Sequence, residues 1–359
     1  MTHAAAPMLP GRLGTPGMQL RDDPRADPRM LAAMAPLQMD VSAPPPPVNP
    51  NSPIDQLLDF AAATEAGFGA VFEALLVGLP DVQGVTSSTE VIRSVDGNAI
   101  TLFIHRPAAT RGPLPGVLHL HGGGMVILEA AARPAVRWRD ELAAAGLVVI
   151  GVEFRNGAGT QGPHPFPAGL NDCCSALQWV TDNKARLGIS TLIVSGESGG
   201  GNLSLATALK AKREGRVAQI DGVYAQCPYI SGMYATKPRE LTSLHENDEY
   251  FIGCELMQVL VELYDPSGAN ATNPLAWPYY ATTADLRELP PHIISVNQLD
   301  PLRDEGLVYF RKLLDAGVSA ASRTVNGTCH AGDYIFRGAM PEVFLATIRD
   351  IKGFSESLG

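Results

Sequence analysis

Gly196-Glu197-Ser198-Gly199-Gly200 lies between an apolar run at residues 192–194 and a helix-forming stretch at residues 202–212. A serine flanked by glycines between a strand and a helix predicts a sharp turn that exposes the serine hydroxyl. The glycines are needed because larger side chains would clash where the chain reverses. This stretch therefore predicts an α/β fold and makes Ser198 a candidate nucleophile, with an ordinary glycine-rich turn as the alternative.

A second glycine-rich segment, His121-Gly122-Gly123-Gly124, directly follows a strand-like apolar run. Consecutive glycines leave backbone N–H groups uncovered, and such groups can stabilise a developing oxyanion. A phosphate-binding loop is the alternative, but it would have a lysine soon after, where this chain has Met125 and further apolar residues. We therefore predict an oxyanion hole formed by the N–H groups of Gly123 and Gly124 together with that of Gly199.

The acid and base that a serine nucleophile requires are found downstream. Asp300 follows the strand-like run at residues 292–296, at the edge where open α/β sheets place their sites. The alternative acid, Asp304, is expected in the first turn of the next helix, where a carboxylate suits the helix dipole. His330 is the histidine that follows both Ser198 and the acid, the order expected for such a nucleophile turn. We predict that His330 acts as general base and then general acid, and that Asp300 orients its imidazole.

The composition limits the classes of partner. The 359 residues, 45% hydrophobic and 18% charged, are enough for one large core. The formal net charge of −10 argues against nucleic acids and anionic membranes as partners. The five cysteines show no metal-ligand spacing and favour reduced thiols in the cytoplasm, and the first thirty residues lack the apolar segment of a secretion signal. We therefore expect no metal, no cofactor, no nucleic-acid partner and no membrane segment.

Strands and helices are expected to alternate along most of the chain. An Asp96-Gly97 turn between two apolar runs predicts a hairpin at residues 91–104. Alternation of this kind predicts a mostly parallel sheet flanked by helices. Further strands are expected at residues 117–120, 148–154, 191–195, 222–226, 292–296 and 321–325, and helices near residues 131–145, 168–185, 202–212 and 342–354.

The remaining segments differ in character. Residues 1–52 are rich in proline, and we expect a partly extended arm there. Residues 53–84 carry apolar side chains at helical spacing. Residues 229–275 interrupt the alternation, and we expect a cap segment there because helices inserted at the carboxyl edge of a sheet commonly form lids. The catalytic domain then comprises residues 85–228 and 276–359.

The substrate pocket is expected to be lined by apolar residues that follow the strand ends. We predict Met125, Tyr229 and Ile230 for this lining, with ordinary core packing as the alternative for each. Glu197 either bonds a neighbouring group or faces solvent, and the sequence does not decide between the two. Cys329 adjoins His330 and is either a small buried residue or a thiol that contacts substrate.

The glycine segments and the acid segment together resemble the hormone-sensitive-lipase-like carboxylesterases of the α/β-hydrolase fold. The residues that carry the resemblance are 196–203, 121–125 and 300–306. It implies a carboxylic ester hydrolase with the same catalytic and oxyanion residues, a cap that includes residues 53–84, and a homodimer. It leaves lactonase capacity open. We expect small to medium esters to react through an acyl-enzyme intermediate.

Two positions depart from the family pattern. Many members have an acidic residue soon after the arginine that matches Arg155, whereas residues 156–159 contain none. The family's catalytic histidine is commonly followed by glycine, and here Ala331 follows His330. Two alternative functions stay open. One is an amidase or acyltransferase that uses the same triad, and the other is a non-catalytic module that binds a small ligand, which the presence of His330 disfavours.

Overall fold

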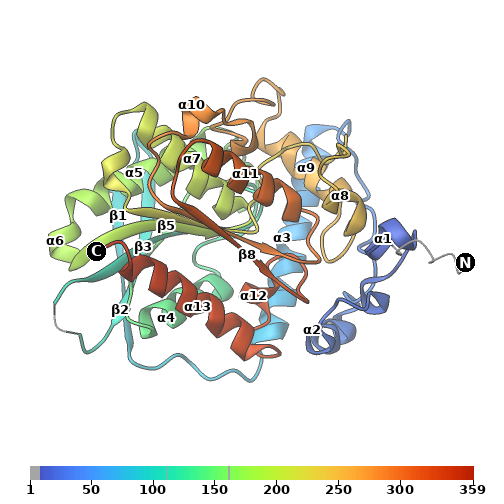
Figure 1. The fold of residues 1–359 in the computed structure, drawn as a ribbon, viewed down its shortest axis with the longest axis horizontal. Helices are drawn as coiled ribbons and strands as arrows, with labels where there is room; N and C mark the ends of the chain where they lie inside the picture. Colours follow the sequence, from blue (N-terminus) through green and yellow to red (C-terminus); the bar gives the residue numbers. More distant parts are fainter. Residues whose placement is uncertain (1–8, 111, 161) are drawn as a thin grey trace, which may run out of the picture.

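The computed structural model describes residues 9–110, 112–160 and 162–359. Its centre is an eight-stranded sheet with the strand order β1-β2-β4-β3-β5-β6-β7-β8 (Figure 1). The strands are β1 (Val85–Arg93), β2 (Ala99–Pro107), β3 (Leu114–Leu120), β4 (Val148–Glu153), β5 (Ile189–Glu197), β6 (Gly222–Gln226), β7 (His292–Asn297) and β8 (Ala320–Val325).

The sheet is parallel from β4 onward and antiparallel at its first edge. β1 and β2 form the predicted hairpin, and β2 pairs with β4 in antiparallel register. β3 pairs in parallel with both β4 and β5, and β6, β7 and β8 continue the parallel order. The predicted α/β-hydrolase sheet is therefore confirmed, and the carboxyl ends of β3, β5, β6 and β7 meet at one edge.

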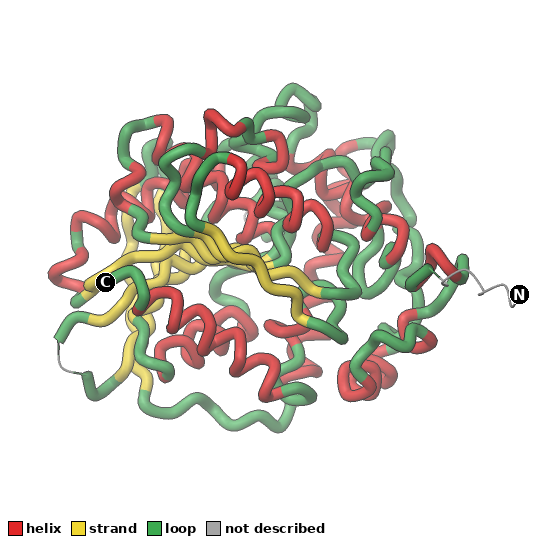
Figure 2. The backbone as a smooth tube through the Cα atoms, viewed as in Figure 1, coloured by secondary structure: helices red, strands yellow, loops and turns green. Residues whose placement is uncertain are grey.

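Helices cover both faces of this sheet (Figures 1 and 2). α4 and α13 pack on one face, and α5, α7 and α11 pack on the other. Because both faces are covered, β3 to β6 are buried over most of their length. The sheet-flanking helices are α4 (Arg133–Ala144), α5 (Ala168–Asp182), α6 (Lys184–Leu187), α7 (Gly199–Arg213), α11 (Arg303–Asp315) and α13 (Pro341–Glu356), with a turn η3 (Val217–Gln219) before β6.

A separate group of helices lies at the carboxyl edge of the sheet. Within residues 53–84 there is one long helix, α3 (Ile54–Leu76), which packs against α9 (Cys254–Tyr264) from the segment between β6 and β7. The apolar spacing predicted at Met257, Leu260 and Leu263 falls within α9, and all three side chains are buried. Two shorter elements, α8 (Ser243–Glu246) and α12 (Gly332–Ile335), also lie near this edge, while η4 (Pro278–Tyr280) and α10 (Thr283–Leu286) pack against α11.

The first described residues differ in part from the partly extended arm expected there. Short helical segments between residues 11 and 37 bury Leu20, Met30 and Met34 almost completely, whereas residues 38–52 form no helix. Pro28 occupies the first position of a helix that the Asp27 side chain caps, and proline favours that position because it lacks the N–H that would be left unpaired. The segments are α1 (Gly11–Gly14), η1 (Leu20–Asp22), α2 (Pro28–Met34) and η2 (Ala35–Leu37).

Across the described part of the chain, no helix combines the length and the apolar character that crossing a membrane would require.

Candidate active site

Ser198 occupies a strained turn between β5 and α7, as predicted. Its backbone angles are φ 55° and ψ −115°, a conformation that L-residues rarely adopt. Close packing enforces the turn, because a Cβ at Gly196 or Gly200 would lie 2.3 Å or 1.8 Å from the carbonyl oxygen of Leu120. The Ser198 N–H donates to the carbonyl of Gln226 at 2.9 Å, which ties the turn to the end of β6.

The predicted oxyanion glycines meet beside this turn. A Cβ at Gly199 would lie 2.6 Å from the backbone nitrogen of Gly124, so only glycine allows the two segments to come this close. Gly123 and Gly124 have φ values of +99° and +64°. Within the described residues, the N–H groups of Gly123, Gly124 and Gly199 find no protein acceptor, so they are available to a ligand.

Glu197 resolves the question that the sequence left open. It is buried, and its carboxylate accepts the N–H of Gly122 at 2.7 Å and bonds the imidazole of His119 at 3.0 Å. The side chain next to Ser198 therefore holds the first residue of the glycine segment 122–124. His121 stacks on Phe154 with a centroid distance of 4.1 Å, and burial lowers the pKa of its imidazole to about 3, so this histidine is neutral.

Asp300 and His330 come together from two loops at the carboxyl edge of the sheet. The Nδ1–H of His330 donates to Oδ2 of Asp300 at 2.8 Å, and Oδ1 of Asp300 accepts the N–H of Leu302 at 2.9 Å. The alternative acid, Asp304, instead accepts the N–H of Ser243 at 2.8 Å and bonds Arg303. Asp300 is therefore the carboxylate that contacts the histidine.

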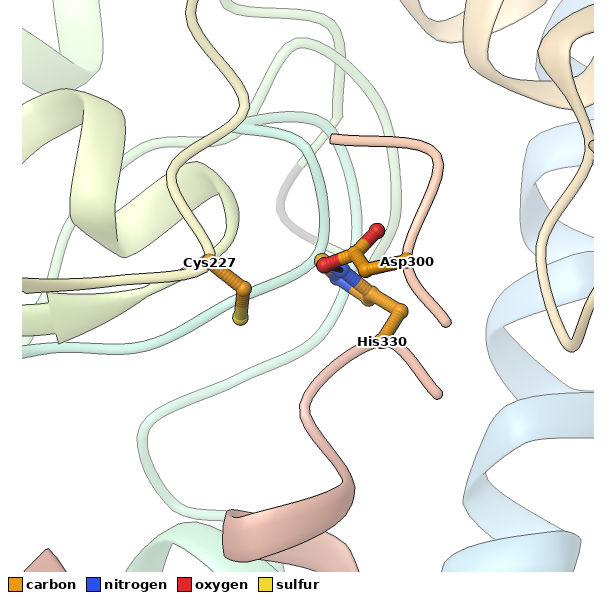
Figure 3. A group of neighbouring side chains, drawn as sticks. All are labelled: Cys227, Asp300 and His330. Atoms are coloured by element: carbon orange, nitrogen blue, oxygen red, sulfur yellow. Dashed lines mark hydrogen bonds and ion pairs between the residues drawn. The ribbon is translucent and has the colours of Figure 1, made fainter. Parts of the chain in front are cut away.

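Cys227 lies beside Asp300 and His330 (Figure 3), and no motif in the sequence marks it as a site residue. Its Sγ, a ring nitrogen of His330 and a carboxylate oxygen of Asp300 all lie within 4.8 Å of one another, a grouping that could hold a metal ion. Burial raises the pKa of the Cys227 thiol well above its ordinary value, and a protonated thiol is a poor metal ligand. Because the carboxylate already accepts from His330, we interpret Cys227 as a neutral neighbour of this pair. Cys329 is likewise buried, and burial raises the pKa of its thiol.

Ser198, His330 and the glycine segment all border one pocket. Ser198, His330 and the glycines 122–124 line it together with apolar side chains from α3, from α9 and from the loop before α9. Those apolar side chains are Phe68, Phe72, Phe251, Ile252, Leu256, Met257 and Leu260.

Of the three residues predicted for the pocket lining, one lines the pocket and two do not. Tyr229 lines the pocket, with its hydroxyl donating to the carbonyl of Met257 at 2.5 Å. Met125 and Ile230 are not among the lining residues. The Met125 side chain is buried in the core, while the Ile230 N–H is fixed by the carboxylate of Glu305 at 2.6 Å. Residues at strand ends fill the core as readily as a pocket, and the sequence does not distinguish the two outcomes.

Residues 156–159 lack the acidic residue that many family members have there, and other contacts hold this part of the chain. The Asn156 side chain donates to the carbonyl of Leu128 at 2.7 Å, and the N–H of Leu128 donates to Glu65 of α3 at 2.6 Å. The N–H of Gly157 donates to the carbonyl of Met125 at 2.9 Å. The segment after the oxyanion glycines is thus held from both sides.

Residues of the N-terminal segment contact the loops that carry Asp300 and His330. Arg25 forms an ion pair with Glu246, which Arg303 also binds at 2.9 Å. The N–H of Cys329 points at the sulfur of Met30 at 3.4 Å. No periodicity in the sequence indicates these contacts, because each is made by a single side chain.

Comparisons with known proteins agree with this architecture. A family model described as the alpha/beta hydrolase fold matches residues 117–332. The chain is 30% identical over 266 residues to the carboxylesterase NlhH of Mycobacterium tuberculosis, covering 72% of this chain and 79% of that protein. It is 31% identical over 218 residues to an arylesterase of Saccharolobus solfataricus, covering 60% of this chain and 67% of that protein.

Solved structures give the same result. A structure titled brefeldin A esterase, a bacterial homologue of human hormone sensitive lipase, superposes with a TM-score of 0.96 at 47% identity, covering 98% of this chain and 99% of that one. The esterase Est22 superposes with a TM-score of 0.84 at 35% identity, covering 94% and 99%. The chain therefore belongs to the α/β-hydrolase family, among its hormone-sensitive-lipase-like carboxylesterases.

Proposed function

We propose that this carboxylesterase acts through Ser198 as nucleophile, His330 as general base and Asp300 as the residue that orients His330. The observation that carries the proposal is the 2.8 Å bond between His330 and Asp300, in a pocket that Ser198 also lines from a strained turn. A serine hydroxyl is a weak nucleophile at neutral pH, so it needs a base within reach and a fixed tautomer of that base.

The reaction follows from these positions. Ser198 Oγ attacks the ester carbonyl carbon while Nε2 of His330 takes the hydroxyl proton. The tetrahedral oxyanion accepts from the N–H groups of Gly123, Gly124 and Gly199, each donor contributing about 3 kcal/mol of transition-state stabilisation. The C–O bond to the alcohol then breaks, and His330 returns its proton to the leaving oxygen. His330 takes a proton from water as the water attacks the acyl-enzyme carbonyl, and it then returns that proton to Ser198 Oγ as the carboxylic acid leaves.

The pocket chemistry supports small to medium apolar esters as substrates. Its walls consist largely of phenylalanine, leucine and isoleucine side chains from α3, from α9 and from the loop before α9. An apolar pocket of this kind distinguishes one methylene from the next by only about 1–3 kcal/mol, so we expect broad tolerance. Lactones fall within the same chemistry, because ring opening uses the same carbonyl attack.

Replacement of the nucleophile tests the proposal. Ser198→Ala should lower kcat for p-nitrophenyl butyrate by about 10⁴-fold or more, with residual turnover from the oxyanion donors. The exposed serine variant Ser88→Ala serves as control and should keep the parent rate. Rapid quenching of the parent enzyme should yield a butyryl group on the peptide that contains Ser198. A Ser198→Ala enzyme with most of the parent activity would refute the nucleophile, and faster turnover of matched amides would refute the esterase preference.

A further inference from the structure

A second cavity lies beside the catalytic pocket, between the N-terminal segment and α3. It has a volume of about 400 Å³, whereas the catalytic pocket measures about 110 Å³. One wall is formed by residues 37–39 and 41–47, which include the run of four prolines. The opposite wall is one face of α3, where Phe60, Thr64, Gly67 and Val71 follow one another at helical spacing.

The two cavities share a wall that is one layer of side chains thick. Phe68, Phe251 and Leu256 line both of them. The rings of Phe68 and Phe251 are tilted against each other with a centroid distance of 6.0 Å, and Phe68 is half-buried. Phe68 reaches this wall from α3 and Phe251 from the loop before α9, so side chains of these two elements separate the two spaces.

The chemistry of the second cavity suits a hydrocarbon chain. Among the described residues that line it, none carries a charge. The prolines contribute no N–H donors, and their fixed φ keeps this wall extended and rigid. Polar groups placed in such a cavity would lose hydrogen bonds to water, whereas methylenes become more stable on burial.

We propose that this cavity is an outer subsite that receives the far end of a hydrocarbon chain of the ester, while the carbonyl lies at Ser198. The inference rests on the proposed function and extends it to a substrate class, esters with a linear chain too long for the catalytic pocket. The chain end crosses the wall at Phe68 and Leu256 and lies along the proline run. Both the acyl chain and the alcohol chain of an ester have this chemistry, and they are distinguished by the substrates used below.

Gly67 offers a way to fill the cavity without touching the catalytic residues. It lines the second cavity but not the catalytic pocket, and a Cβ at this position would meet no atom within 4 Å. Gly69 lies in the same helix with equally open space at its Cβ, and it lines neither cavity. Leucine favours a helix over glycine, so Gly67→Leu and Gly69→Leu should both fold, and only the first should occupy the subsite.

The experiment compares kcat/KM over two substrate series. p-Nitrophenyl esters from acetate to dodecanoate vary the acyl chain, and acetate esters of alcohols from ethanol to dodecanol vary the alcohol chain. We expect Gly67→Leu to lower kcat/KM about tenfold or more for the long members of one series, and less than about twofold for acetate substrates with short alcohols. Gly69→Leu should reproduce the parent profile in both series.

The outcomes separate this inference from the proposed function. If Gly67→Leu shows the parent chain-length profile in both series while Ser198→Ala is inactive, the subsite is refuted and the catalytic assignment stands. If both glycine variants lose long-chain activity equally, the loss comes from a change in α3 itself and not from filling the cavity, and the subsite is refuted as well. If Ser198→Ala remains active, the catalytic assignment itself fails. Equal thermal unfolding midpoints of the two leucine variants establish that folding does not cause the difference.

Discussion

The two halves of the active site are held in place by different kinds of contact. On the side of Ser198, backbone packs directly on backbone. Gly199 and Gly200 have no room for a Cβ beside Gly124 and Leu120. This half derives from adjacent strands, since β3 and β5 pair in parallel register and each delivers its loop at the same edge. Its geometry is fixed by excluded volume.

On the side of Asp300 and His330, side chains hold the loops in place. The amide of Asn247 donates to the carbonyl of Asp300 at 3.1 Å, and its oxygen accepts from Arg25 at 3.1 Å. Arg25 and Arg303 converge on the buried carboxylate of Glu246. The contacts of Arg25 connect parts of the chain that are more than two hundred residues apart.

These two kinds of contact tolerate different changes. Excluded volume does not titrate and permits no added atom, so the backbone contacts at Gly199 and Gly200 should be insensitive to pH and intolerant of any larger residue. Ion pairs and hydrogen bonds respond to protonation and to charge removal, so the histidine side should lose its geometry gradually. Substitutions on each side test whether the two halves differ in this way.

The largest effect is expected at the carboxylate that His330 contacts. Asp300→Asn keeps the size of the side chain but removes its negative charge and replaces one of the two acceptor oxygens with an NH2 donor. The imidazole then adopts the wrong tautomer, and kcat should fall by about 10⁴-fold, measured as steady-state hydrolysis of p-nitrophenyl butyrate. The matched control is Asp304→Asn, since Asp304 bonds Ser243 and Arg303 instead. A larger loss from Asp304→Asn than from Asp300→Asn would reverse the assignment of the acid.

A smaller but still large effect is expected from one methyl group on the serine side. In Gly200→Ala, the new Cβ would lie 1.8 Å from the carbonyl oxygen of Leu120, so the turn or the neighbouring strand must shift. A shift that removes one oxyanion donor lowers kcat by about 10²–10³-fold. The loss should be the same at every pH between 6 and 9, because the contact between Gly200 and the carbonyl of Leu120 contains no titrating group.

Its control is another helical glycine. At Gly353 in α13, an added Cβ would meet no atom within 4 Å, so Gly353→Ala should keep the parent activity. Equal activity of Gly200→Ala and Gly353→Ala would mean that close packing does not define the turn. A pH-dependent loss in Gly200→Ala would remove the contrast between the two halves.

The serine side is also the part that the sequence reveals best. Glycines at fixed offsets from Ser198 and after His121 are local signals, because each marks a place where backbone must approach backbone. The strands around them are apolar runs that a buried parallel sheet requires. The sheet, the hairpin and the partners Asp300 and His330 could therefore be predicted from the order of the residues alone.

Other features carry no such signal. Met125 and Ile230 follow strand ends as a pocket residue would, but their side chains fill the core. The role of Glu197 depends on which loop lies opposite it, and that is a property of the sheet order. The N-terminal segment looks extended from its prolines, yet Pro28 starts a helix and Met30 reaches the loop of His330. Tertiary contacts made by single side chains leave no periodicity to detect.

The smallest effect is expected from the N-terminal ion pair. Arg25→Gln removes the charge that Glu246 and Asp23 share, while the side chain remains partly buried. We expect a loss of about 1–3 kcal/mol in the free energy of unfolding, measured by urea titration, and a fall in kcat of about tenfold or less. The control is Arg29→Gln, four residues further along, whose side chain and whose partner Glu342 are largely exposed, so its ion pairs should contribute less to the free energy of unfolding than those of Arg25.

The pH dependence of the loss in unfolding free energy shows whether Arg25 acts through its charge or through packing. Burial alone would raise the pKa of Glu246, but its bonds to Arg303 and Arg25 outweigh burial and hold that pKa below the ordinary value of 4.5. A carboxylate with a lowered folded pKa contributes stability that is present above 4.5 and is lost as the pH falls through its folded pKa. The stability gap between the parent and Arg25→Gln should therefore be full at neutral pH and should close below about pH 4.5. A gap that stays constant through this range would mean that Arg25 stabilises the loops by packing rather than by charge, and the histidine side would then resemble the serine side after all.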